Sequence, residues 1–123
     1  MIIVVDSLTG QGQRFAQKLG YPVVDVNLGI EDKLQPLFLV TRSFNFGQVP
    51  EPTLDFLDRY HKRVVAVVVS GNRNWGENYG KAGERIRDRY GIPLLLKFEG
   101  SGFKNDIQLV QDWIQKYEEE KEV

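Results

Sequence analysis

Five short apolar runs recur along the chain, and segments with helical periodicity separate most of them. Each run is long enough for one strand, and continuous apolar runs are typical of strands buried on both faces of a sheet. The predicted strands are Ile2 to Val5, Val23 to Val26, Leu37 to Thr41, Val64 to Ser70 and Leu94 to Phe98. Strands that alternate with helices form parallel sheets through right-handed crossovers. The pattern therefore predicts an α/β fold.

Four segments carry apolar residues at the three- and four-residue spacing of an amphipathic helix. The predicted helices are Gln11 to Leu19, Thr53 to His61, Glu77 to Tyr90 and Lys104 to Tyr117. Pro52 precedes the second helix, and Gly20 and Gly91 follow the first and third, as is common at helix ends. The stretch from Leu28 to Gln35 is too short and irregular for a good helix, so we expect a loop or a single turn. The like-charge tail from Glu118 to Glu122 predicts a fraying, solvated helix end.

A chain of 123 residues with five strands and helices on both faces fits one domain, residues 1–123. We predict a flavodoxin-like three-layer sandwich with the parallel strand order 2-1-3-4-5. In such sheets the ligand lies at the carboxyl ends of the strands, near the point where the strand order reverses. Three loops should meet there: Asp6 to Gly12, Arg42 to Pro50 and Ser70 to Glu77.

Composition and charge exclude several classes of function. Sixteen basic and seventeen acidic residues give a net charge of −1, which argues against a nucleic-acid binder with a basic face. The absence of cysteine excludes disulfides, thiolate nucleophiles and iron–sulfur clusters. The single histidine, His61, stands beside two basic residues at a predicted helix end, so we expect neither a metal site nor a catalytic triad. No signal-peptide or membrane-span pattern is visible at the N-terminus, and we expect a cytoplasmic protein.

The first loop, DSLTGQG, lies between a buried strand and a helix start. Hydroxyl groups and exposed backbone N–H groups in that position favour a phosphate. The loop lacks the third glycine of a dinucleotide fingerprint, because Phe15 stands there, and it lacks the Gly-Lys-Ser/Thr ending of a P-loop. The alternative is that Ser7 or Thr9 only caps the following helix.

The middle loop places Phe44 and Phe46 on either side of Asn45, with Gly47 after them. Two aromatic side chains in a polar loop at the ligand edge fit a planar ring system by offset stacking. We expect one of them to face the ligand and the other to close the core. A phosphate-accepting response regulator would need an acidic residue at the end of the third strand, and Thr41 stands there instead.

The third loop, SGNRNWGENY, supplies a second aromatic wall through Trp75. Asn72 and Asn74 would reach the polar edge of a ring, and Gly71 and Gly76 allow unusual backbone angles or a close ligand approach. A phosphate grip, an aromatic slot and an amide-rich rim together describe a site for a mononucleotide with a large flat ring. Flavin mononucleotide (FMN) fits this description best.

Four motifs of the chain resemble the NrdI family, small flavodoxin-like flavoproteins that accompany class Ib ribonucleotide reductase. They are DSLTGQGQRF, FGQVPE followed by LDFL, SGNRNWGENY and KFEGSGFKND. The resemblance covers nearly the whole chain and implies an FMN site. It implies that the phosphate is held by Ser7, Leu8, Thr9, Gly10, Gln11 and Gly12 and the ring bordered by Ser43, Phe44, Asn45, Phe46 and Gly47. It also implies that the ring is covered by Gly71, Asn72, Asn74, Trp75 and Gly76.

The resemblance also implies the function. The reduced flavin would convert O2 into superoxide or peroxide, which the dimanganese small subunit of the reductase uses to form its tyrosyl radical. Electrons would come from a separate flavin or flavodoxin reductase. No catalytic residue and no metal ligand of this chain is implied.

Two other functions remain open at this stage. The first is a general flavodoxin that carries electrons between soluble proteins, although such carriers more often have acidic rims. Here Arg42 and Arg73 offset Asp6 and Glu77. The second is a binding module without redox activity, since a fold does not fix a function. Arg73 is open to interpretation either as surface charge or as a contact for a partner.

One departure from related sequences concerns the middle loop, where they often carry glycines and this chain carries Asn45. A peptide that turns its carbonyl group toward a ring nitrogen needs an unusual φ. Glycine adopts such a φ freely, and asparagine tolerates it better than most residues.

Overall fold

The computed structural model describes residues 1–31 and 33–121. Within these residues five parallel strands form one sheet in the order β2-β1-β3-β4-β5, which confirms the predicted order. The strands are β1 (Ile2–Val5), β2 (Val23–Asp25), β3 (Leu37–Arg42), β4 (Val64–Ser70) and β5 (Leu94–Phe98). The α-helices are α1 (Gln11–Gln17), α2 (Glu51–Tyr60), α3 (Lys81–Tyr90) and α4 (Lys104–Lys121). Two 3-10 helices, η1 (His61–Arg63) and η2 (Arg73–Asn78), flank β4.

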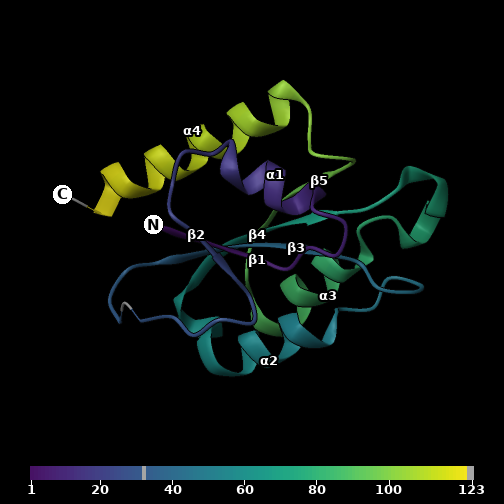
Figure 1. The fold of residues 1–123 in the computed structure, drawn as a ribbon, viewed down its shortest axis with the longest axis horizontal. Helices are drawn as coiled ribbons and strands as arrows, with labels where there is room; N and C mark the ends of the chain where they lie inside the picture. The colour runs from purple at the N-terminus through teal and green to yellow at the C-terminus, as the bar shows by residue number, and fades with distance from the viewer. Residues whose placement is uncertain (32, 122–123) are drawn as a thin grey trace.

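The helices form two layers, with α1 and α4 on one side of the sheet and α2 and α3 on the other (Figure 1). Successive residues of a strand point to opposite faces, so each strand contributes to two separate cores. Ile3 and Val5 of β1 belong to the core under α1 and α4, whereas Ile2 and Val4 belong to the core under α2 and α3. Burial on both faces explains why the strands read as continuous apolar runs.

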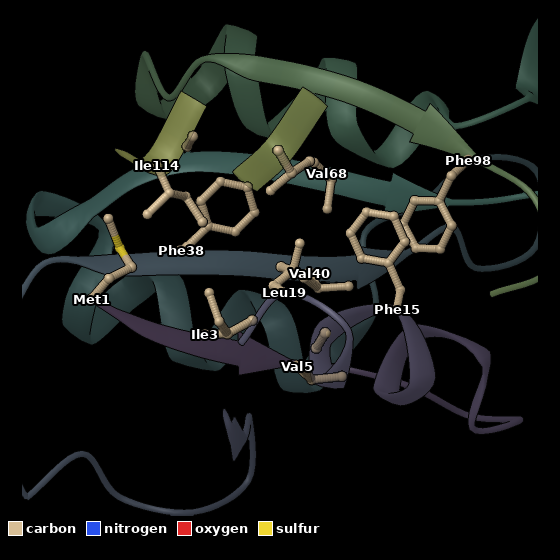
Figure 2. Close-up of a cluster of buried hydrophobic side chains, with 13 residues drawn as sticks. Met1, Ile3, Val5, Phe15, Leu19, Phe38, Val40, Val68, Phe98 and Ile114 are labelled. Carbon is tan, nitrogen blue, oxygen red and sulfur yellow. The ribbon is translucent and has the colours of Figure 1, made fainter. Parts of the chain in front are cut away.

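The core under α1 and α4 contains the largest buried rings (Figure 2). Phe15 of α1 and Phe98 of β5 stack with their ring centroids 4.1 Å apart. Both side chains are almost completely buried. Their contact joins α1 to the far edge of the sheet and so fixes where the loop before α1 lies relative to the end of β5.

The predicted start of the third helix, Glu77, is wrong, because α3 begins at Lys81. Two glycines interrupt the helical path: Gly76 has φ 57° and ψ −121°, and Gly80 has φ 61°. Tyr79, between them, is extended and does not lie on the helical stripe that the periodicity predicts. The apolar spacing extends across a loop that local backbone geometry keeps out of the helix.

Other boundaries differ by smaller amounts. β2 ends at Asp25, one residue early, where its carboxylate accepts a 2.8 Å hydrogen bond from the N–H of Asn27 and forms a turn. β3 continues to Arg42, and α2 begins at Glu51 with Pro52 in its first turn. α1 ends at Gln17, although Leu19 is still buried as its spacing predicted.

The structure also tests the predictions for the stretch from Leu28 to Gln35, for the charged tail and for His61. No helix forms between Leu28 and Gln35 among the residues that the structure describes; Asp32 lies outside them. The tail is helical as far as Lys121, and Glu122 lies outside the described residues. His61 ends α2 as expected, with its Nδ1 2.8 Å from the carbonyl oxygen of Leu57.

Across residues 1–31 and 33–121, none of the helices combines the length and apolar character needed to cross a membrane.

Candidate functional site

A cleft of about 450 Å³ opens at the carboxyl ends of β1, β3, β4 and β5. This volume lies in the range typical of small-molecule and cofactor sites, about 300–1,000 Å³. The lining residues come from all three loops that the sequence predicts to meet there, and from the segment after β5. They are Ser7, Leu8, Thr9, Gln11, Gly12, Arg42, Ser43, Asn45, Ser70, Gly71, Asn72, Trp75, Asn78, Gly80, Glu99 and Gly100.

The loop after β1 is held in shape by its own side chain. The hydroxyl oxygen of Ser7 accepts a 3.1 Å hydrogen bond from the N–H of Gly10, which has φ 86°. Ser7 therefore braces the loop, and its hydroxyl hydrogen stays available to donate into the cleft. The backbone N–H groups of Leu8 and Thr9 donate to no acceptor in the described part of the chain. The loop thus presents several donors and no acidic side chain to a ligand.

The loop after β3 is a tight hairpin. Phe44 and Gln48 exchange two backbone hydrogen bonds of 2.7 Å each. Asn45, at the tip, has φ 51°, the only positive φ of a non-glycine residue among those described. Glycine adopts such a φ freely, and asparagine tolerates it better than most other residues do. Gly47 is buried against α3, where a Cβ atom would lie 2.4 Å from the Cβ of Lys81.

The expectation that one phenylalanine of this hairpin closes the core is wrong. Phe44 is 47% exposed and Phe46 is 73% exposed. The hairpin contacts α3 through the buried Gly47 and not through either aromatic ring. Neither ring lines the cleft itself. Phe46 instead stands at its rim, edge-to-face with Trp75 at a centroid distance of 6.3 Å.

The loop after β4 brings Trp75 and two asparagines to the cleft. Asn72 caps η2 by accepting a 2.8 Å hydrogen bond from the N–H of Asn74, which leaves its amide nitrogen free to donate. Asn74 does not belong to the lining, and Asn78 lines the cleft instead. The indole of Trp75 is 50% exposed and forms part of the wall.

A buried polar network supports the floor of the cleft. Asp6, only 5% exposed, accepts a 2.7 Å hydrogen bond from the hydroxyl of Thr53 and a 3.2 Å hydrogen bond from Nε of Arg42. Thr41 and Thr53 join their hydroxyl groups at 2.7 Å. Asp6 is thus a buried, paired carboxylate rather than a charge on the rim.

Arg73 is paired with Glu99 across the mouth of the cleft. Its backbone N–H and its Nε each lie 3.1 Å from one of the two carboxylate oxygens of Glu99. This pair ties η2 to the segment that follows β5. Arg73 and Glu99 offset each other, so the mouth carries no strong net charge.

Six of the residues predicted for the site lie outside the cleft lining: Gly10, Phe44, Phe46, Gly47, Asn74 and Gly76. Another six residues line the cleft but were not among the residues predicted for the site: Arg42, Ser70, Asn78, Gly80, Glu99 and Gly100. The sequence could have indicated Glu99 and Gly100, because they follow the fifth predicted strand and the carboxyl ends of parallel strands meet at one edge of the sheet. Over the ranges that the structure describes, no cluster of three or more acidic or histidine side chains is arranged to hold a metal ion.

Comparison with known proteins identifies relatives that match most of the chain. The model of the family described as "NrdI Flavodoxin like" matches residues 3–112. The chain is also 45% identical over 111 residues to the protein NrdI of Macrococcus caseolyticus, a match that covers 88% of this chain and 84% of that protein.

Solved structures with the same fold are flavodoxins of low sequence identity. A short-chain flavodoxin associated with a non-canonical PDU bacterial microcompartment superposes with a TM-score of 0.72 at 19% identity, covering 93% of each chain. Oxidised flavodoxin 1 of Bacillus cereus has a TM-score of 0.67 at 18% identity, covering 91% of this chain and 92% of that one. A mutant of Fusobacterium nucleatum flavodoxin, bound to flavin mononucleotide, has a TM-score of 0.63 at 16% identity, covering 93% of this chain and 92% of that one. These likenesses establish the flavodoxin-like fold.

Proposed function

Because this chain belongs to the NrdI family of flavodoxin-like proteins, we propose that it binds FMN in the cleft and activates the small subunit of a class Ib ribonucleotide reductase. The observation that carries the proposal is the cleft itself, which brings three glycine- and amide-bearing loops together at the carboxyl edge of the sheet. In open α/β sheets that edge is where cofactors bind.

The residues present fit a flavin mononucleotide. The loop from Ser7 to Gly12 offers unpaired N–H groups and a hydroxyl hydrogen, which suit the phosphate. Trp75 offers a half-exposed indole face at the wall, which suits a flat aromatic ring. Asn72 and Asn78 offer amide groups, which suit the polar edge of that ring.

When bound and reduced, the flavin would supply the electrons that turn O2 into the superoxide or peroxide used by the dimanganese subunit for its tyrosyl radical. The chain's own residues would bind and orient the cofactor and leave one side of the cleft accessible. Asn45, at the tip of the hairpin, would place its strained peptide beside the ring.

The rim supports contact with a protein partner. Phe46, Trp75 and Leu8 are large apolar side chains that stay exposed around the cleft. Exposed apolar groups gathered in one place commonly mark a protein interaction surface. The proposed partners are the dimanganese small subunit and, as electron donor, a flavin or flavodoxin reductase. We expect these encounters in the cytoplasm.

A general flavodoxin electron carrier is the second candidate, favoured by the flavodoxin structures that share the fold. Carriers that dock on basic partners use acidic rims. In this chain the carboxylate that lines the cleft, that of Glu99, is paired with Arg73, so its charge is offset.

The test has two stages. The first is titration of the purified protein with FMN, monitored by visible absorbance and flavin fluorescence; a chain that binds no FMN refutes the proposal at this point. In the second stage, the reduced complex is mixed with manganese-loaded small subunit and O2, and the tyrosyl radical is measured by electron paramagnetic resonance. A radical signal well above that obtained with free reduced FMN supports activation. A signal equal to the free-flavin control favours the carrier.

A further inference from the structure

Arg42 is the one cationic side chain in the lining of the cleft, among the residues that the structure describes. It ends β3, its side chain is 19% exposed, and its Nε lies 3.2 Å from Oδ1 of Asp6. A guanidinium group has five N–H donors, and this bond uses one of them. The terminal nitrogens Nη1 and Nη2 make no hydrogen bond to any described residue.

We propose that Arg42 is a further ligand-binding residue, whose terminal nitrogens pair with the phosphate monoester of the bound mononucleotide. The inference deepens the proposed function and rests on it. Arginine is suited to this task because its planar fork matches the oxygens of a phosphate in a bidentate arrangement.

The position of Arg42 favours the phosphate over the ring. Asp6, its partner, directly precedes the loop from Ser7 to Gly12, whose N–H groups form the candidate phosphate site. The bond to Asp6 therefore holds the guanidinium beside the start of that loop. Trp75, the candidate ring contact, belongs instead to η2, which follows the neighbouring strand β4.

The charges around the cleft also favour a cation at this place. Asp6 is a buried carboxylate next to the candidate phosphate site, and it would repel a dianion that approached it. Arg42 lies against this carboxylate and offsets its charge. The other charged side chain in the lining, Glu99, is already paired with Arg73.

Asp6 in turn acts as a positioning residue for Arg42. Its second oxygen, Oδ2, accepts the 2.7 Å hydrogen bond from Thr53, so the carboxylate is fixed from the side of α2. A guanidinium held at Nε by a fixed carboxylate loses less side-chain freedom when it binds an anion. The arrangement is preorganised for an anionic group such as a phosphate.

The experiment compares two ligands that differ only in the phosphate, FMN and riboflavin. Each is titrated into the full chain and its variants by flavin fluorescence quenching, at low and at high salt. For Arg42→Gln we expect FMN affinity to fall by about tenfold or more, with riboflavin affinity changed by less than about twofold. The salt dependence of FMN binding should also become weaker.

Two further variants complete the design. Arg87→Gln removes an exposed charge of α3 that lies outside the cleft, and we expect it to leave both affinities unchanged. Arg42→Lys keeps a positive charge without the fork, and we expect an intermediate loss for FMN alone. Circular dichroism melts identify any variant that fails to fold. If Arg42→Gln does not fold, the affinities of Arg42→Lys for FMN and riboflavin are compared instead.

The outcomes separate the inference from the proposed function. If Arg42→Gln lowers FMN and riboflavin affinity equally, or changes neither, the inference is wrong while the FMN site stands. If the unaltered chain binds neither flavin, the proposed function is wrong and the inference with it. A loss confined to FMN supports both.

Discussion

The hydroxyl group of Thr53, in the first turn of α2, donates a 2.7 Å hydrogen bond to the buried carboxylate of Asp6 at the end of β1. The two residues are 47 positions apart in the chain. With the hydroxyl contact between Thr41 and Thr53, this bond links three elements beneath the cleft. A helix, a central strand and the start of the candidate phosphate loop are thereby held in one polar cluster.

Replacement of Thr53 by valine should destabilise the protein. Valine keeps the shape but removes the donor, so Oδ2 of Asp6 would be buried without this partner, at a cost of about 1–3 kcal/mol. Urea unfolding of Thr53→Val against the unaltered chain measures the difference. Thr53→Ser keeps the hydroxyl group and is the matched control. Equal stability of Thr53→Val and the unaltered chain would show that water satisfies Asp6.

Removal of the indole of Trp75 should weaken FMN binding. Trp75 lines the cleft and meets Phe46 edge-to-face at 6.3 Å. Loss of stacking on the ring is expected to cost about 1 kcal/mol, roughly a fivefold increase in Kd. Fluorescence titration of Trp75→Ala provides the value, with Leu109→Ala as the control, because Leu109 of α4 is exposed and lies outside the lining. An unchanged Kd for Trp75→Ala would place the ring elsewhere.

The backbone of Asn45 should respond to substitution according to its positive φ of 51°. A β-branched residue is strained in this region, so Asn45→Val is expected to lose about 1–2 kcal/mol of unfolding free energy. Asn45→Gly should be close to neutral, because glycine adopts the conformation without strain. Thermal melts of the two variants test this. A larger loss for glycine than for valine would contradict the backbone argument and point to the side chain.

Glu84 should make stability depend on pH in the acid range. The hydrogen bond from Lys97 Nζ to its carboxylate, 2.8 Å long, lowers the pKa of Glu84 below its usual value of 4.5, against a smaller opposing effect of burial. A lowered folded-state pKa stabilises the protein above the unfolded value, and this contribution is lost as the pH falls through the folded value.

Glu84→Gln tests this dependence by urea unfolding at pH 7 and pH 3. We expect the variant to be less stable at pH 7 by up to about 1 kcal/mol, since the pair is partly exposed, and the difference to be smaller at pH 3. Glu77→Gln, at an exposed position in η2, serves as the control and should show no such change. A deficit of the same size at both pH values would indicate lost packing instead of lost charge pairing.

The order of apolar runs and helical segments along the chain was enough to predict the layers and the strand order. The run from Val64 to Ser70 is apolar at nearly every position because helices cover both faces of β4. Such a run is typical of a central strand in a parallel sheet. The same pattern placed three loops at one edge, where the structure has its cleft. Local rules also identified Asn45 as a residue able to adopt a positive φ.

The end of the loop before α3 and the burial of the hairpin side chains depend on contacts between distant residues, which local patterns do not predict. Helical spacing extended to Tyr79, yet Gly76 and Gly80 and the contact of Lys97 with the Tyr79 carbonyl hold that segment out of α3. The sequence predicted that Phe44 or Phe46 would close the core, but the folded hairpin packs on α3 through Gly47 and leaves both rings exposed.

The pairing of Asp6 with Arg42 is another feature that the sequence could not predict, because it joins residues 36 positions apart. Residue type gave each of them a charge, but their partners and burial depend on how β1, β3 and α2 pack together. Periodicity and turn chemistry act over a few neighbouring residues, so they determine the elements. The charge of the cleft is set by contacts between those elements, which exist only once the chain is folded.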